Sequence, residues 1–269
     1  MQYDPIKKTL GNIFNRTPFL RVLFYKLLDI LLLRAWYVKK EIRSWAKEKN
    51  NPVTILDAGS GFGQYSFFIS GMNKSWSIDA VDVKEDQIHD CTDFFARIKR
   101  KNVRFEIADL TKFSKAGSYD LILSVDVMEH ILEDVEVFKN FYASLGKNGM
   151  LLVSTPSDQG GSDVHDHGEE ASFIDEHVRD GYNILEIQEK LKSAGFSRTD
   201  AYYAYGKPGQ LAWRLSMKYP IVMLNASKIF FILLPFYYLL TFWIALICNY
   251  IDLGSKHPSG TGLVVRAWK

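Results

Sequence analysis

Cysteine is scarce in this chain, which has only Cys91 and Cys248 among its 269 residues. Two cysteines give no disulfide framework, and their scarcity fits a reducing cytoplasm. Lys26, Asp29 and Arg34 interrupt the apolar residues near the N-terminus, so we expect no secretory signal peptide there. Internal repeats and low-complexity tracts are lacking too. The length therefore predicts one large domain, or a domain with an appendage.

A large excess of charge of one sign is also missing, since the formal net charge is +2. The total nevertheless conceals a segregation along the chain. Residues 1–50 carry 11 Lys and Arg against 4 Asp and Glu, whereas residues 51–196 carry 14 against 25. Residues 197–269 carry 8 against 2. Basic ends suit nucleic acid or anionic lipid, and the apolar content of these ends favours lipid.

The most informative motif is the stretch 53–64, in which an apolar run ends at an acid and three alternate glycines follow. This pattern predicts a buried parallel strand that enters a tight turn and then a helix. The dinucleotide fingerprint needs a further glycine where this chain has Gln64. The acid, Asp57, can accept a hydrogen bond from a cationic or hydroxyl-bearing ligand. We therefore expect an adenosine-containing cofactor at the carboxyl edge of a parallel sheet, with a nicotinamide enzyme as the alternative.

An acid ahead of G-x-G-x-G resembles motif I of the class I S-adenosylmethionine-dependent methyltransferases, and Met-Glu-His-Ile at 128–131 resembles their type 11 members. The resemblance covers roughly residues 50 to 200. It implies a Rossmann-like, doubly wound α/β fold with seven strands in the order 3-2-1-4-5-7-6, the last strand antiparallel. The first five expected strands lie in the stretches 53–58, 76–82, 103–110, 119–125 and 145–154, and the sixth and seventh in 197–205 and 261–268.

The resemblance also implies which residues hold S-adenosylmethionine and release S-adenosylhomocysteine. The glycine turn would hold the methionine end, an acid after the second strand would meet the ribose, and an acid after the third would meet the adenine. The expected cofactor-binding residues are Asp57, Gly59, Gly61, Gly63, Asp82, Val83, Asp109, Leu110 and Asp126.

Candidate catalytic residues follow the fourth strand. Asp126, Glu129 and His130 have the i, i+3, i+4 spacing that puts side chains on one face of a helical turn. His130 is a candidate general base for an acceptor hydroxyl, because imidazole titrates near neutral pH. The alternative is that Glu129 and His130 only shape the cofactor site, which we favour for Glu129.

A second candidate group lies in the stretch 176–182, which also resembles the type 11 methyltransferases. His177 is a candidate catalytic residue, and Arg179 and Tyr182 are candidates to position the acceptor. Arg179 has an alternative as a structural partner of Glu176 and Asp180.

The stretch 163–170 is rich in histidine and acid, but it adjoins a glycine-rich loop and has no further Cys/His pair at metal spacing. We expect no metal site there.

Two segments outside the cofactor motif are apolar. Residues 19–47 have the spacing of one long helix, either packed on the sheet, capping the cofactor site or lying at a membrane surface. Residues 229–251 contain no charge. Because the flanking stretches are expected in one sheet, a single membrane crossing is excluded, and we expect a monotopic or re-entrant hairpin. A buried dimer interface and a lid over an apolar pocket are the alternatives.

The expected organisation is an N-terminal basic and apolar helical segment (1–49), a cofactor-binding core (50–208), an apolar helical insertion (209–257) and a final core strand (258–269). The predicted function is methyl transfer from S-adenosylmethionine to a small amphiphilic or lipid-like acceptor, with a hydroxyl as one candidate. A nucleic-acid (RNA) methyltransferase and a non-catalytic cofactor-binding protein are the alternatives, although no RNA-binding module is recognisable. The expected location is the cytoplasm, as a peripheral or monotopic protein at the inner face of the cytoplasmic membrane, with an anionic membrane surface as a partner.

Overall fold

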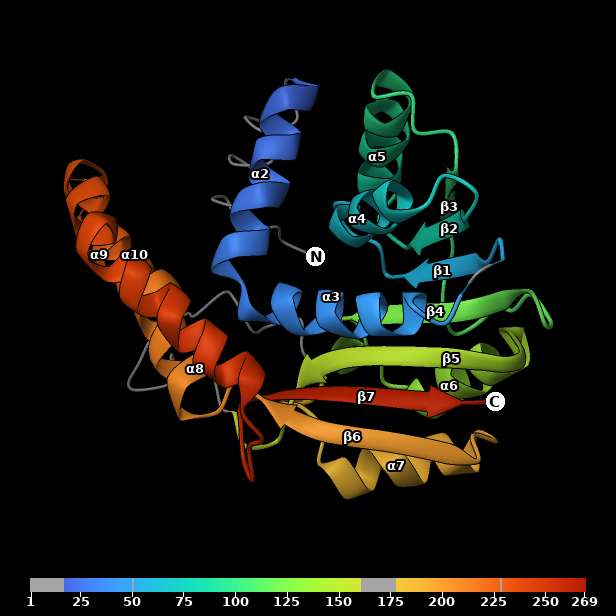
Figure 1. The fold of residues 1–269 in the computed structure, drawn as a ribbon. Helices are drawn as coiled ribbons and strands as arrows, with labels where there is room; N and C mark the ends of the chain where they lie inside the picture. The colour runs from blue at the N-terminus through green and yellow to red at the C-terminus, as the bar shows by residue number, and fades with distance from the viewer. Residues whose placement is uncertain (1–16, 50, 161–177, 228) are drawn as a thin grey trace.

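A computed structural model describes residues 17–49, 51–160, 178–227 and 229–269. Its centre is a seven-stranded sheet in the order β3-β2-β1-β4-β5-β7-β6 (Figure 1), which confirms the predicted fold and strand order. Neighbouring strands pair in parallel except β7, which is antiparallel to both β5 and β6. The strands are β1 Thr54–Ala58, β2 Ser77–Asp82, β3 Val103–Ile107, β4 Tyr119–Val125, β5 Leu145–Pro156, β6 Arg198–Ala204 and β7 Gly262–Trp268.

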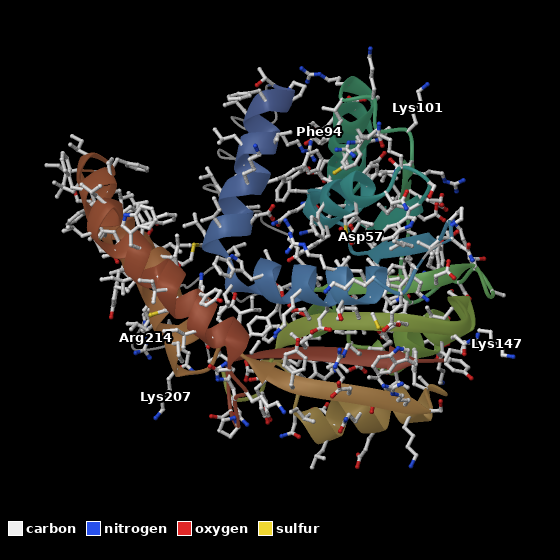
Figure 2. The ribbon with its side chains drawn as sticks, in the orientation of Figure 1. Asp57, Phe94, Lys101, Lys147, Lys207 and Arg214 are labelled. Carbon is white, nitrogen blue, oxygen red and sulfur yellow. The ribbon has the colours of Figure 1, made fainter. Side chains whose placement is uncertain are left out.

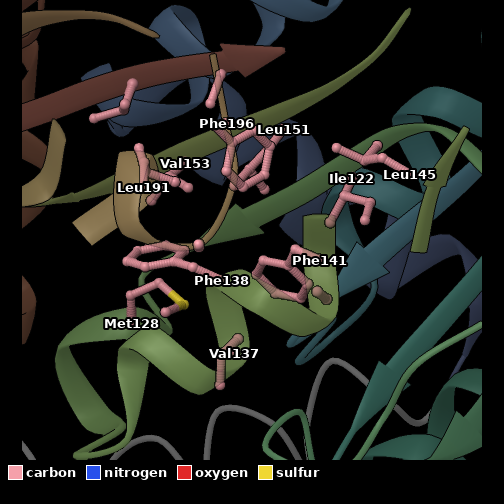
Figure 3. Close-up of a cluster of buried hydrophobic side chains, with 14 of the residues drawn as sticks. Ile122, Met128, Val137, Phe138, Phe141, Leu145, Leu151, Val153, Leu191 and Phe196 are labelled. Carbon is pink, nitrogen blue, oxygen red and sulfur yellow. The ribbon is translucent and has the colours of Figure 1, made fainter. Parts of the chain in front are cut away.

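Helices cover both faces of the sheet, as the near-continuous apolar strands require. On one face, helices α6 and α7 bury Phe138, Phe141 and Leu191 against Leu151 and Val153 of β5, and Figure 3 shows this cluster. On the other face, helices α3 and α4 pack against β1, β4 and β5. The helices around the sheet, including α5, are α3 Leu33–Ala46, α4 Gln64–Met72, α5 Glu85–Arg97, α6 Asp134–Ser144 and α7 Ile184–Ser193.

The segment predicted as one long helix is two helices, α2 (Pro18–Leu31) and α3, so that prediction was wrong. Leu32 interrupts them in an extended conformation, with φ −94° and ψ 108°. The break lets the two helices meet different partners. α3 lies on the sheet, whereas α2 turns away and places Tyr25 in an aromatic cluster with Phe94 and Phe95 of α5. Spacing along the chain gave no sign of this change in direction.

Between β6 and β7 the chain forms an arm of helices that projects from the sheet (Figure 1). We call this arm the hairpin and define it as residues 207–254. Its ascending half contains α8 (Lys207–Trp213), a π-helical turn η2 (Arg214–Lys218) and α9 (Tyr219–Ala226), and its descending half is α10 (Phe230–Gly254). At 25 residues, α10 is about 37 Å long. Within the described residues, it is the one helix that could cross a membrane by length and composition.

Both ends of the hairpin join the sheet at the same edge. β6 runs antiparallel to β7, so Ala204 at the end of β6 pairs with Gly262 at the start of β7. That edge is also where the parallel strands β1, β2 and β4 end. The hairpin and α2 therefore both flank the carboxyl edge of the sheet (Figure 1).

Candidate functional site

The turn between β1 and α4 has the backbone geometry that its glycines suggested. Gly59, Gly61 and Gly63 have φ values of 81°, 50° and 73°, in the left-handed region that side chains rarely adopt. Space is equally restrictive at the first glycine, since a Cβ on Gly59 would lie 2.3 Å from Cγ2 of Val127. The missing side chain thus lets the turn after β1 approach the segment after β4.

Asp57 lies within β1 one residue before its end, and its carboxyl group is buried inside the protein (Figure 2). The hydroxyl of Ser66 on α4 donates a hydrogen bond of 2.6 Å to its Oδ2 atom. Burial raises the pKa of Asp57 to about 6, and the hydrogen bonds from Ser66 only partly oppose that rise. The carboxyl therefore ties α4 to β1 and becomes easier to ionise if a cation binds nearby.

Asp82 connects the second strand to the glycine turn. One of its carboxylate oxygens accepts the N–H of Gly61 at 2.9 Å, and the other accepts the N–H of Lys84 at the same distance. Each oxygen keeps a lone pair for a further donor, such as a hydroxyl. The predicted ribose acid is thus held against the glycine turn.

Asp109 follows β3 and is engaged in its own turn. Its Oδ1 atom accepts the N–H and the hydroxyl of Thr111, at 2.9 and 2.7 Å. These hydrogen bonds, followed by the contacts of Lys112, hold the pKa of Asp109 below its usual value. The adjacent Leu110 is buried in the core, whereas Val83 after β2 is exposed. Adenine recognition by Asp109 stays a prediction.

The residues after β4 do not share one helical face, so that prediction was wrong. Asp126 has a φ of 51°, and only a short 3-10 turn, η1, follows at Met128–His130. Asp126 has a left-handed backbone, and the 3-10 turn after it has three residues per turn where an α-helix has 3.6. The side chains of Asp126, Glu129 and His130 therefore do not point in the common direction that an α-helix would give them. Glu129 is buried, with its carboxyl accepting the hydroxyl of Thr155 at 3.1 Å, whereas His130 is exposed. Burial raises the pKa of Glu129.

Arg34, at the start of α3, is the main site residue that the sequence did not identify. Its guanidinium forms an ion pair with Asp126 and a hydrogen bond with the hydroxyl of Tyr65 on α4. Its backbone N–H donates to the hydroxyl of Tyr205, just after β6, at 2.8 Å. One residue thus joins α3 to the ends of β4 and β6. The only sequence signal was that Arg34 interrupts an apolar run.

The Nε atom of Arg34 is buried and has no hydrogen-bond partner within the described part of the chain. A buried N–H without an acceptor costs free energy until an acceptor reaches it. Arg34 therefore offers a donor for an anion beside the segment after β4. The glycine turn, Asp82 and Arg34 together fit a ligand that carries hydroxyl groups and a carboxylate.

Arg179 and Tyr182 are both drawn to Asp134, at the start of α6. The guanidinium of Arg179 forms an ion pair with Asp134, and the hydroxyl of Tyr182 donates to it at 2.7 Å. Lys190 of α7 adds a contact of 2.7 Å to the same carboxylate. Burial opposes ionisation of Asp134, but the hydrogen bonds from Lys190 and Tyr182 outweigh it, so its pKa lies below the ordinary value.

Arg179 also donates to the carbonyl of Ile131 at 2.7 Å, which fixes residues 178–182 against the turn after β4. The ion-pair partner of Arg179 within the described residues is Asp134. A direct contact of Arg179 or Tyr182 with an acceptor stays a prediction. His177 and the histidine-rich stretch 163–170 lie outside the described residues, as does Glu176.

Comparisons with known proteins are consistent with this geometry. A family model described as a methyltransferase domain matches residues 49–197. A phosphoethanolamine N-methyltransferase from Triticum aestivum is 28% identical over 156 residues, which cover 55% of this chain and 30% of that protein. A malonyl-[acyl-carrier protein] O-methyltransferase 2 from Ilyobacter polytropus is 26% identical over 139 residues, or 51% of each protein.

A solved structure of phosphoethanolamine N-methyltransferase 2 from Haemonchus contortus, with phosphomonomethylethanolamine and S-adenosylhomocysteine, superimposes with a TM-score of 0.62. The superposition covers 97% of this chain and 59% of that one, at 16% identity. Identity this low shows the fold alone. The chain spans about a third to a half of the length of the two curated relatives.

Replacing Asp57 by Asn should stabilise the protein in the absence of ligand. A folded-state pKa of about 6, against 3.8, means that stability falls as the pH rises from about 4 to 6. We expect Asp57→Asn to remove this fall, with a gain of up to about 3 kcal/mol at pH 7.5 and about 1 kcal/mol at pH 4.5. Urea denaturation at the two pH values measures the free energy of unfolding of the variant and the parent. A variant that is less stable than the parent by the same amount at both pH values contradicts the prediction.

Replacing Asp134 by Asn should have the opposite effect. The ionised carboxylate of Asp134 pairs with Arg179 and Lys190. Its loss should lower the free energy of unfolding by about 3 kcal/mol at pH 7. Because the folded-state pKa is lowered, the cost should shrink as the pH falls through the ordinary carboxyl value and below. Asp180→Asn, at an exposed neighbouring position, is the matched control. Equal destabilisation by both variants in urea melts would contradict the assignment.

Proposed function

The chain belongs to the methyltransferase family, and on that basis we propose that it transfers a methyl group from S-adenosylmethionine to a small amphiphilic or lipid-like acceptor. The observation that carries the proposal is the left-handed glycine turn at the carboxyl edge of the sheet. This turn is hydrogen-bonded to Asp82, and the segment after β4 that it approaches contains Asp126, the ion-pair partner of Arg34. The proposed location is the inner face of the cytoplasmic membrane, where the protein would be peripheral or monotopic.

Each described group of the site fits one part of the cofactor. Asp82 has carboxylate lone pairs for the ribose hydroxyls, and Arg34 has a buried N–H for the methionine carboxylate. The turn leaves room for close approach at Gly61, where a Cβ would lie 3.7 Å from Oε1 of Gln87 among the described residues. When bound, the cofactor supplies a methyl group on a positively charged sulfur atom, which is a good leaving group.

The work left to the protein is mainly alignment of the two reactants. An acceptor hydroxyl must also lose its proton, and His130 is the exposed imidazole beside the turn after β4. The buried Glu129, held by Thr155, suits a role in shaping the site. We therefore assign the proposed proton acceptor to His130.

An amphiphilic acceptor is supported by the apolar hairpin beside the site. The most apolar 18-residue stretch of α10 has a mean hydropathy of 2.2, and 6% of that stretch is buried inside the protein. Because β6 and β7 pair with each other, the hairpin returns to the side from which it left. α10 therefore cannot cross a membrane once, and the proposed placement is a hairpin that enters one leaflet.

The direct test is to incubate the full chain with methyl-labelled S-adenosylmethionine and total cell lipids. We expect label in one lipid-like species together with formation of S-adenosylhomocysteine. Label in RNA instead would favour the nucleic-acid alternative. Tight cofactor binding without any turnover would favour a non-catalytic role.

Asp82→Asn should weaken binding of S-adenosylhomocysteine at least tenfold. The amide has one acceptor oxygen where the carboxylate has two, so it cannot accept the N–H groups of Gly61 and Lys84 and both ribose hydroxyls together. A tenfold loss corresponds to about 1.4 kcal/mol. Titration calorimetry measures the affinity, and Glu189→Gln, at an exposed position on α7, is the control. Unchanged affinity for S-adenosylhomocysteine in the Asp82 variant would show that Asp82 does not bind the cofactor.

His130→Ala should lower kcat about 100-fold, because a positioned general base typically contributes this much. Affinity for S-adenosylhomocysteine should stay within twofold, since the side chain is exposed and lies outside the glycine turn. A rise in KM with unchanged kcat would instead assign His130 to acceptor binding. Activity equal to that of the parent in both parameters would exclude either role.

A further inference from the structure

Helix α2 buries the charged Arg21 and exposes several large apolar side chains, with the exposed Lys26 among them. Arg21 is 3% exposed, whereas Phe19 is 75% exposed. Leu23, Leu27 and Ile30 are exposed on the same helix. Spacings of four, four and three residues place these four apolar side chains along one face. We call Phe19, Leu23, Leu27 and Ile30 the α2 stripe.

The buried side of α2 is held by specific contacts to the cofactor half of the sheet. The guanidinium of Arg21 donates to the carbonyls of Phe62, in the glycine turn, and Asp90, on α5, each at 3.0 Å. It also lies over the ring of Phe94, 4.7 Å from the centroid. These contacts fix which way α2 faces, so the exposure of the stripe follows from the fold.

The hairpin exposes a second apolar surface at the same edge of the sheet. Large side chains of α10 that are more than half exposed include Phe231, Phe236, Leu240, Trp243, Ile247 and Tyr250. Isolated exposed apolar residues are ordinary, but an exposed surface of this extent marks an interaction site.

Inside the hairpin, three side-chain hydroxyls bond to backbone carbonyls, whereas the buried Oδ1 of Asn249 has no partner within the described residues. The hydroxyls of Tyr237 and Tyr238 donate to the carbonyls of Leu215 and Ser216 in the π-helical turn, each at 2.7 Å. The hydroxyl of Thr241 donates to the carbonyl of Tyr237 at 3.0 Å. Internal satisfaction of backbone groups is what a hydrocarbon environment demands.

Charge also favours a membrane over a second protein surface. The described basic residues of the hairpin are Lys207, Arg214 and Lys218, and Figure 2 labels the first two on its ascending half. Its acidic residue within that described part, Asp252, is buried at the base. An apolar arm with cations on one side suits the anionic surface of a leaflet.

The base of the hairpin is attached to α3, and therefore to α2. The buried carboxylate of Asp252 accepts the hydroxyl of Tyr37 at 2.7 Å and the N–H of Gly209 at 2.9 Å. Lys40 adds a hydrogen bond of 2.9 Å to the carbonyl of Leu253. The α2 stripe and the hairpin are thus held at fixed positions on the two sides of the site that contains Arg34.

We infer that the α2 stripe and the hairpin form one lipid-facing surface, and that an acceptor resident in the bilayer reaches the site between them. The apolar chain of the acceptor stays in the leaflet while its polar head meets the carboxyl edge of the sheet. This inference rests on the proposed function and deepens it. It adds a second membrane contact, on α2, and a direction of entry.

The test uses three variants of the full chain, each with one added cysteine in a Cys248→Ser background that keeps Cys91. They are Leu27→Cys in the α2 stripe, Leu240→Cys in the hairpin and the control Lys147→Cys, which lies at the far edge of the sheet (Figure 2). Burial raises the pKa of the remaining Cys91 thiol to about 12, so it should resist labelling. Each variant is labelled at the introduced cysteine with an environment-sensitive dye. It is then mixed with vesicles that contain equal amounts of phosphatidylcholine and phosphatidylglycerol.

With vesicles present, we expect iodide quenching of the dyes at 27 and 240 to fall at least threefold, and quenching by lipid-attached nitroxide to appear. The dye at 147 should not change. Protection at 240 alone would overturn the inference, because the hairpin would then enter the leaflet without α2. Protection at both positions without vesicles, in a dimer by light scattering, would assign the surface to a second copy.

Absence of protection at both positions would also overturn the inference. None of these outcomes depends on methyl transfer. Calorimetry with S-adenosylhomocysteine, performed on the same variants, reports separately on the cofactor site. Loss of cofactor binding by the parent chain would contradict the proposed function, whereas normal binding with an unprotected α2 contradicts only the lipid-facing surface.

Discussion

The close approach of two turns at the carboxyl edge of the sheet is the constraint on which the site depends. Gly59 adopts a left-handed conformation in direct reach of Val127, and a Cβ there would overlap that side chain. Because the turns after β1 and β4 meet, Asp82 can hold the first turn while Asp126 of the second lies against Arg34. The site is therefore assembled by backbone proximity, and side chains add charge to a shape that already exists.

The strands could be predicted from the sequence because four of them end in a recognisable signal, whereas their order in the sheet came from the family resemblance. Asp57 with its glycines, Asp82 and Asp109 all mark positions where a buried apolar run must stop. The acids were identified, but their internal partners were not. Ser66, which binds Asp57, lies on the following helix, and its hydroxyl carries no distinctive pattern. Resemblance to a family supplied the order of strands β6 and β7, which spacing alone does not determine.

The N-terminal helices show why the remainder could not be predicted. Periodicity says which residues share a face, but not which face meets the protein. The partners of Arg21 are carbonyls 41 and 69 residues away, so its burial depends on the tertiary fold. The same limit hid Arg34, whose partners lie after β4, on α4 and after β6. A charged residue that interrupts an apolar run is a signal of long-range contact, and both arginines carry it.

Topology explains why an apolar arm occurs between β6 and β7. The antiparallel β7 makes this connection begin and end at the carboxyl edge, so any insertion there stands beside the cofactor site. An insertion after a parallel strand would have to return to the opposite edge before the next strand began. The arm can therefore lengthen without changing the register of the sheet. Its anchor, Asp252 bound to Tyr37 and Gly209, transmits its position to the helix that carries Arg34. The exposed apolar arm and the buried Arg34 are thus joined through one helix, α3.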